Sequence, residues 1–118
     1  MYICFNIRGR LGNAIFRYLA SAILCIISNR KYSSKLIGGI NITDEMFYNI
    51  SKNLLENKLI KLPEQNLIMS DFYQHDKIYL KYREKIFKFI NTNREHLIIT
   101  DGINAGDMKC ETYKCMIF

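Results

Sequence analysis

The sequence predicts an α/β protein: a Rossmann-like parallel sheet of about four strands with helices on both faces. Apolar runs rich in β-branched and aromatic residues alternate with segments whose apolar residues recur at helical spacing. Such alternation implies strand–helix–strand units, and right-handed crossovers place their helices over the sheet. With 118 residues, 49% hydrophobic and 24% charged, the chain has the size and composition of one globular domain. We expect regular units over residues 1–101 and an irregular tail over residues 102–118.

Four runs are candidate strands, and a fifth lies in the tail. Tyr2–Ile7 is continuously apolar, as in a strand covered on both faces. Lys35–Ile40 is a second candidate, although its two glycines weaken the pattern. The third and fourth candidates are Asn66–Ser70 and His96–Thr100. In the tail, Tyr113–Phe118 is a further strand candidate.

Three segments are candidate helices. Gly12–Asn29 has a narrow polar stripe, which predicts a helix mostly buried against the sheet; the stripe consists of Arg17, Ser21 and Ser28. The second helix begins at a cap, Thr43 or Asp44, and runs to about Asn57. The third spans Asp76 to about Asn91, with an inward face formed by Ile78 or Tyr79, Tyr82, Ile86, Phe89 and Ile90.

The chain is basic, with a net charge of +6 and a pI near 9.2. Such a balance favours polyanions, phosphorylated small molecules or acidic membrane surfaces as partners. The third helix carries an outer row of lysines: Lys77, Lys81, Lys85 and Lys88. Dedicated nucleic-acid domains concentrate their basic residues more tightly. We therefore interpret this row as a solvated face and expect no nucleic-acid partner.

The cysteines and the apolar first helix bear on the compartment. Cys4 and Cys25 fall within apolar patterns, and no histidine cluster accompanies Cys110 and Cys115, so no metal site is expected. Nothing resembles a disulfide framework, which favours a reducing, cytoplasmic location. The apolar run Tyr18–Ile27 is too short to span a membrane, and the small residues of a signal-peptide cleavage site do not follow it. Membrane association and secretion are left open.

The turn between the first strand and the first helix favours an anionic ligand. Gly9 and Gly12 permit a tight backbone, and a helix N-terminus offers unpaired N–H groups to an anion. Arg10 and Arg17 add positive charge. The turn has neither the Gly-Lys-Ser/Thr of a Walker A loop nor the third glycine of the dinucleotide fingerprint. It therefore fits neither pattern well.

A second loop rich in functional side chains, Asp71–Asp76, follows the third candidate strand. Imidazole titrates near neutral pH, so His75 beside Asp76 is either a general base for a hydroxyl group or an ordinary surface histidine. Asp71 and Asp101 both follow strands, where a carboxylate can accept a sugar hydroxyl. We favour turn-stabilising roles for both, because aspartate is a frequent turn residue.

Two segments resemble motifs of the α-1,2-fucosyltransferase family. Gly9-Arg10-Leu11-Gly12-Asn13, with Phe16 and Tyr18 one turn on, is similar to the family's amino-terminal motif G-G/R-L/F-G-N-Q. Asp71-Phe72-Tyr73-Gln74-His75-Asp76-Lys77 resembles its G-Y-F-Q-S-E-K segment, again between a strand and a helix. The resemblance covers about residues 1–90.

The resemblance implies one half of a GT-B-type glycosyltransferase that transfers fucose from GDP-fucose to a sugar hydroxyl with inversion. Arg10 would lie near the diphosphate, and Asn13 would act near the glycosidic oxygen or the acceptor. The implied substrate-binding residues are Gly9, Arg10, Gly12, Asn13, Arg17 and Gln74; Asn13 and His75 are the catalytic candidates. Ala14 and Arg17 stand where the family has glutamine, so a polar group is lost and a cation is added. No metal or other cofactor is implied.

The family's donor-binding motif, H-x-R-R-x-D, lies in its second half and does not occur in these 118 residues. We therefore expect a truncated or incomplete form, whose cleft a second domain or subunit would complete. Whether this chain alone is active is left open. The alternative is a non-catalytic module that binds phosphate or another polyanion through Arg8, Arg10 and Arg17.

Overall fold

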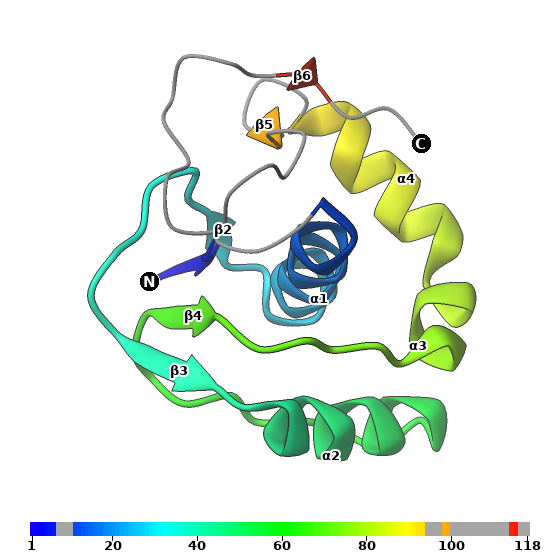
Figure 1. Ribbon diagram of the computed structural model, residues 1–118. Helices are drawn as coiled ribbons and strands as arrows, with labels where there is room; N and C mark the ends of the chain where they lie inside the picture. Colours follow the sequence, from blue (N-terminus) through cyan, green and yellow to red (C-terminus); the bar gives the residue numbers. More distant parts are fainter. Residues whose placement is uncertain (7–10, 94–97, 100–113, 116–118) are drawn as a thin grey trace.

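The computed structural model describes residues 1–6, 11–93, 98–99 and 114–115. Its main sheet has four strands, and each neighbouring pair in it is parallel (Figure 1). In chain order these strands are β1 (Tyr2–Phe5), β2 (Lys31–Tyr32), β3 (Ile40–Ile42) and β4 (Leu67–Met69). Their order across the sheet is β2-β1-β4-β3, so β1 and β4 are the two central strands.

Four helices flank this sheet. The helix α1 (Leu11–Ser28) connects β1 to β2, and α2 (Asp44–Leu55) connects β3 to β4. After β4 the chain continues into α3 (Asp76–Lys81) and α4 (Arg83–Thr92). The α/β class and the parallel sheet of four strands are confirmed, and the arrangement is consistent with a Rossmann-like fold.

The described helices gather on one face of the sheet. Both crossovers, β1–α1–β2 and β3–α2–β4, step to the neighbouring strand in the same direction. Right-handed crossovers that step in the same direction place their helices on the same face. The ring of Tyr79 in α3 lies 6.1 Å from that of Phe16 in α1 and 6.3 Å from that of Phe47 in α2. Helices were expected on both faces, and this part of the chain places them on one.

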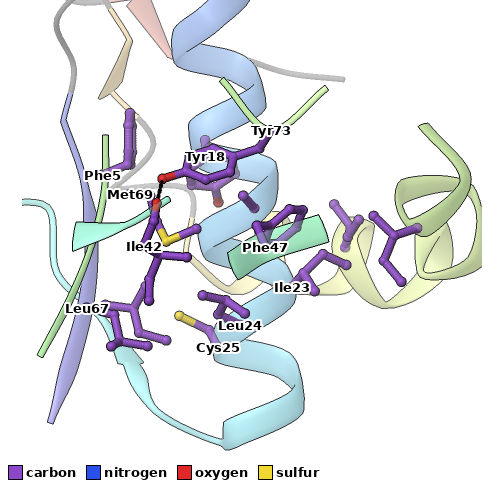
Figure 2. Packing of buried hydrophobic residues seen from close by; sticks show 14 of the residues in the cluster. Phe5, Tyr18, Ile23, Leu24, Cys25, Ile42, Phe47, Leu67, Met69 and Tyr73 are labelled. Carbon is purple, nitrogen blue, oxygen red and sulfur yellow. Dashed lines mark hydrogen bonds between the residues drawn. The ribbon is translucent and has the colours of Figure 1, made fainter. Parts of the chain in front are cut away.

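The core lies between that face and the helices. Ile3 pairs with Leu67, and Phe5 pairs with Met69, which pairs in turn with Ile42. Alternate residues of a strand point to the same side, so these five buried side chains form one apolar surface. Figure 2 shows this surface facing Tyr18, Ile23 and Leu24 of α1 and Phe47 of α2.

The second strand of the sequence analysis, Lys35–Ile40, is wrong. The structure has two short strands instead: Lys31–Tyr32, which precedes this range, and Ile40–Ile42, which shares only Ile40 with it. Between them, Gly39 passes so close to β4 that an added Cβ would lie 2.1 Å from the backbone oxygen of Asn66. After β2, the chain next pairs with the sheet at Ile40, whose N–H donates to that same Asn66 oxygen at 3.0 Å.

The fourth predicted strand is found at β5 (Ile98–Ile99), but it does not join the parallel sheet. It pairs antiparallel with β6 (Lys114–Cys115), which lies within the strand predicted for the tail. An antiparallel partner needs only a loop, whereas a further parallel strand would need a crossover. The other residues of the tail lie outside the described part of the chain.

One expectation about the helices needs correction. The single helix predicted from Asp76 is divided at Tyr82, so that α3 packs against α2 and α4 against α1. In α1, which is mostly buried as predicted, two residues of the polar stripe, Arg17 and Ser21, are buried as well. Ser21 stays satisfied because its hydroxyl donates to the Arg17 carbonyl oxygen at 2.8 Å.

Cys4 and Cys25 are buried, as the sequence predicts. Burial raises the pKa of both thiols, that of Cys25 to about 12. Both side chains therefore act as neutral, small apolar groups of the core.

Candidate functional site

The functional side chains meet at the carboxyl edge of β3 and β4. The loop 70–75 leaves β4 there, and α2 begins one residue after β3. Because the strands are parallel neighbours, this loop and the first turn of α2 lie side by side. In open parallel sheets, this edge is where ligands bind.

A buried tyrosine organises the loop. The Tyr73 hydroxyl accepts hydrogen bonds from the backbone N–H of Ser70 and of Asp71, each at 3.0 Å, and donates to the Ile42 carbonyl oxygen. Tyr73 adopts a left-handed backbone conformation (φ 49°), which residues other than glycine rarely take. Burial raises the pKa of Tyr73 to about 12, although the two N–H donors oppose the shift. The phenol thus joins the ends of β3 and β4 in one fixed geometry.

Two aspartates tie the loop to α2. The Asp44 N–H donates to Asp71 Oδ2 at 2.9 Å, and Asp44 Oδ1 accepts from the Tyr73 N–H at 3.1 Å. Asp71 Oδ1 also accepts from the Phe72 N–H at 3.1 Å. The turn-stabilising role expected of Asp71 is therefore found, whereas Asp101 lies outside the described residues.

His75 is held by Asp44. Its Nε2 lies 3.0 Å from Asp44 Oδ1, and the imidazole is 23% exposed. The ring packs against Phe47 and Tyr48, with centroids 5.9 and 5.6 Å away. An ionised carboxylate only accepts hydrogen bonds, so Nε2 is the donor in this contact, and in the neutral imidazole Nδ1 is then the acceptor. The partner of His75 is therefore Asp44, and the contact is not with the sequence neighbour Asp76.

Asp44 was not predicted as a site residue, because the sequence pattern indicates only a possible helix cap there. The cap is Thr43, whose Oγ1 accepts from the Met46 N–H at 3.1 Å. The local signal was the pair Thr-Asp itself: once threonine caps the helix, the following carboxylate is available for other contacts. Nothing in the sequence connects Asp44 with His75.

A hollow of about 420 Å³ opens beside these groups. Its lining consists of Asp44, Asp71, Phe72, Gln74 and His75. Phe72 is 51% exposed, and Gln74 is exposed as well. Carboxylates, an amide and an imidazole can bind hydroxyl groups, while an exposed ring offers an apolar face. The hollow has the size of a small-ligand site.

Of the residues predicted from the first motif, Gly12 and Asn13 lie in the first turn of α1, with Gly12 exposed and Asn13 partly buried. Neither is part of the hollow's described lining, so the structure brings Gln74 and His75 together there without them. Gly9 and Arg10 lie outside the described residues, as does Arg8.

Arg17 connects the two motif segments from inside the protein. Its side chain is 7% exposed, with Nε donating to the Asp71 carbonyl oxygen at 2.9 Å and a terminal nitrogen donating to the Asn6 carbonyl oxygen at 3.2 Å. The guanidinium also lies 5.8 Å from the centre of the Phe72 ring. Burial lowers the pKa of Arg17, and Tyr73 and Asp71 oppose the shift. We interpret Arg17 as positioning the loop rather than binding substrate directly.

The described residues contain no group of three or more histidine, cysteine, aspartate or glutamate side chains that could hold a metal ion. Among the same residues, none of the helices combines the length and apolar character needed to cross a membrane.

Comparisons of the chain with protein-family models, with curated proteins and with solved structures found no significant match.

Proposed function

We propose that this chain is the acceptor-binding half of a glycosyltransferase, with a saccharide hydroxyl bound in the hollow beside His75. The observation that carries the proposal is the His75–Asp44 pair on the wall of that hollow. A base held by a carboxylate, beside hydroxyl-binding groups and an exposed aromatic ring, suits the activation of a sugar hydroxyl.

In the proposed reaction, Nδ1 of His75 accepts the proton of the acceptor hydroxyl. The hydroxyl oxygen forms a bond to the anomeric carbon of the donor sugar as the bond from that carbon to the diphosphate breaks. The electron pair leaves with the nucleoside diphosphate, and the configuration inverts. Asp44 positions the imidazole through Nε2 and stabilises the imidazolium ion formed.

The donor proposed is GDP-fucose, on the strength of the two segments that resemble the α-1,2-fucosyltransferase family. The contact between Arg17 and Asp71 supports it, because it joins one segment directly to the other. Arg10 and Asn13 would face the diphosphate and the reacting oxygens. A second domain or subunit would hold most of the nucleotide.

Backbone amide NMR of the isotopically labelled chain tests the proposal, with lactose as a neutral acceptor and GDP-fucose as the donor. Lactose at millimolar concentration should shift the amide signals of Asp44, Phe72, Gln74 and His75. Phe72→Ala and Gln74→Ala should each weaken that binding by about three- to tenfold, because each removes one contact to the sugar. Phe87→Ala is the matched control, since Phe87 is an exposed aromatic residue on α4 outside the hollow.

No response around the hollow with lactose, together with no heat from GDP-fucose in calorimetry, would refute the proposal. Equal loss of lactose binding in Phe87→Ala and Phe72→Ala would also count against it.

A further inference from the structure

A second hollow, of about 320 Å³, lies between α2 and the start of α3. We call it the α2–α3 groove; its lining includes Tyr48, Ser51, Lys52, Leu55, His75 and Lys77. His75 also lines the hollow at the carboxyl edge, so the imidazole lies between the two.

Ser51 gives the α2–α3 groove a polar group without a partner. The residue is 3% exposed, and no partner for its hydroxyl is found in the described part of the chain. Other helical hydroxyls in this molecule do have partners four residues earlier: Ser21 donates to the Arg17 carbonyl, and Thr92 to the Lys88 carbonyl. Because an unsatisfied buried hydroxyl lowers stability, a ligand hydroxyl that reaches Ser51 Oγ from the groove would gain the hydrogen bond that the described structure leaves unmade.

The charged side chains of the groove favour an anion. Lys52 comes from α2 and Lys77 from α3, so each of the two helices that form the groove contributes one lysine to its lining. Of the two acids that line the groove, Glu56 is paired with Lys58 at 2.9 Å, which lowers the pKa of Glu56. The other, Asp76, lies in the first turn of α3, so two lysines of the lining stand against this single remaining acid.

The remaining lining is apolar. Leu55 and the buried Ile78 contribute aliphatic surface, and the half-exposed ring of Tyr48 lies beside the imidazole of His75. An apolar floor with one hydroxyl and two ammonium groups matches a pyranose ring. Its C–H face packs on the floor, one hydroxyl meets Ser51, and an acidic substituent meets the lysines.

We propose that the α2–α3 groove is a second saccharide subsite that takes a sugar unit bearing a carboxylate or a phosphate. This inference rests on the proposed function, because His75 would then act on an acceptor that extends from one hollow into the other. The acceptor is accordingly an acidic saccharide.

Amide NMR of the full chain with four probes tests this: glucose, glucuronate, glucose 6-phosphate and inorganic phosphate. Glucuronate or glucose 6-phosphate should shift the signals of Tyr48, Ser51 and Leu55 at lower concentration than glucose does. The acidic sugar that binds more tightly identifies the substituent as carboxylate or phosphate. Inorganic phosphate should not reproduce these shifts.

Variants locate the contacts. Ser51→Ala, Lys52→Ala and Lys77→Ala should each weaken binding of the acidic sugar by about three- to tenfold, the loss of one hydrogen bond or ionic contact. Lys85→Ala is the matched control, since Lys85 is exposed on α4 and lies over the Tyr82 ring. Ser51→Ala should fold at least as well as the wild type, because the hydroxyl that it removes has no partner in the described structure.

The outcomes separate this inference from the proposed function. Lactose shifts at Phe72 and Gln74, with no acidic sugar bound in the α2–α3 groove, would overturn the inference and leave the proposed function standing. If inorganic phosphate bound as tightly as the acidic sugars, the groove would bind the anion alone, and its assignment as a saccharide subsite would be wrong. If glucose and glucuronate bound with equal affinity, and Lys52→Ala left both affinities unchanged, the groove would not recognise an acidic substituent and that part of the proposal would be wrong. Failure of every sugar at both hollows would overturn both.

Discussion

The imidazole Nε2 of His75 lies 3.0 Å from Asp44 Oδ1, a contact between residues 31 positions apart. The same carboxylate oxygen accepts from the Tyr73 N–H, so one atom fixes both the backbone of the loop and the histidine ring. Loop geometry and imidazole orientation are therefore coupled through Asp44. A substitution at this position should disturb both together.

Asp44→Ala should lower the free energy of unfolding by about 1–3 kcal/mol, because it leaves the Tyr73 N–H without its acceptor. Glu45→Ala is the matched control: Glu45 is also an acid in the first turn of α2, so both changes remove the same interaction with the helix dipole. Urea denaturation of the two variants measures the difference. Equal losses would mean that the Asp44 contacts contribute nothing beyond that interaction.

Arg17→Lys should destabilise the fold by about 1.5–3 kcal/mol although it keeps the charge. An ammonium group lacks the planar fork with which the guanidinium reaches the carbonyls of Asp71 and Asn6 at once. Urea denaturation measures the loss, and Arg83→Lys, at an exposed position of α4, is the control. A loss no larger than that of the control would contradict the positioning role of Arg17.

Ser51→Ala should raise the free energy of unfolding by about 1 kcal/mol, since it removes a buried hydroxyl without a partner and improves helix propensity. Ser21→Ala gains the same propensity but loses the hydrogen bond to the Arg17 carbonyl. The two serines are both buried in helices, so thermal unfolding of the pair isolates that hydrogen bond. If Ser51→Ala were the less stable variant, the hydroxyl would have a structural partner and the case for a ligand there would weaken.

Gly39→Ala and Gly38→Ala make a second matched pair. A Cβ at Gly39 would meet the Asn66 backbone oxygen at 2.1 Å, whereas one at Gly38 would have no neighbour within 4 Å. Gly39→Ala should therefore cost about 1–3 kcal/mol of stability. Gly38→Ala should be neutral or slightly stabilising. Equal stability of the two variants in urea would show that the connection between β2 and β3 can move away from β4 at little cost.

Local patterns predicted the parts of this fold that local physics determines. The apolar runs at Tyr2–Ile7 and Asn66–Ser70 contain β1 and β4, because central strands need continuous apolar surface. Lys31–Tyr32 was missed since two residues carry no periodicity, and this strand exists through its pairing with β1. The site was predictable only in part. The loop with Gln74 and His75 was recognised from its sequence. Asp44, the partner of His75, was not, because it lies beside that loop only when β3 pairs with β4.

Stability should fall steeply at alkaline pH. Burial raises the pKa of Tyr73 to about 12, above the 10.0 of an unperturbed tyrosine. Between these values the unfolded chain releases the phenolic proton while the folded chain keeps it, so rising pH favours unfolding by about 1.4 kcal/mol per pH unit. Below about pH 10 the contribution is fully present. Tyr32 and Tyr79, whose pKa values burial also raises, add to the slope.

Tyr73→Phe separates the contribution of Tyr73 to this slope from those of the other two tyrosines. The variant should be less stable than the wild type at neutral pH, because the N–H groups of Ser70 and Asp71 lose their acceptor. Its stability should nevertheless decline by about 1.4 kcal/mol per pH unit less than that of the wild type at high pH. Urea denaturation at several values between about pH 9 and about pH 11 measures both effects. Identical slopes for the two proteins would show that Tyr73 ionises in the folded chain as readily as in the unfolded chain, which its three hydroxyl contacts argue against.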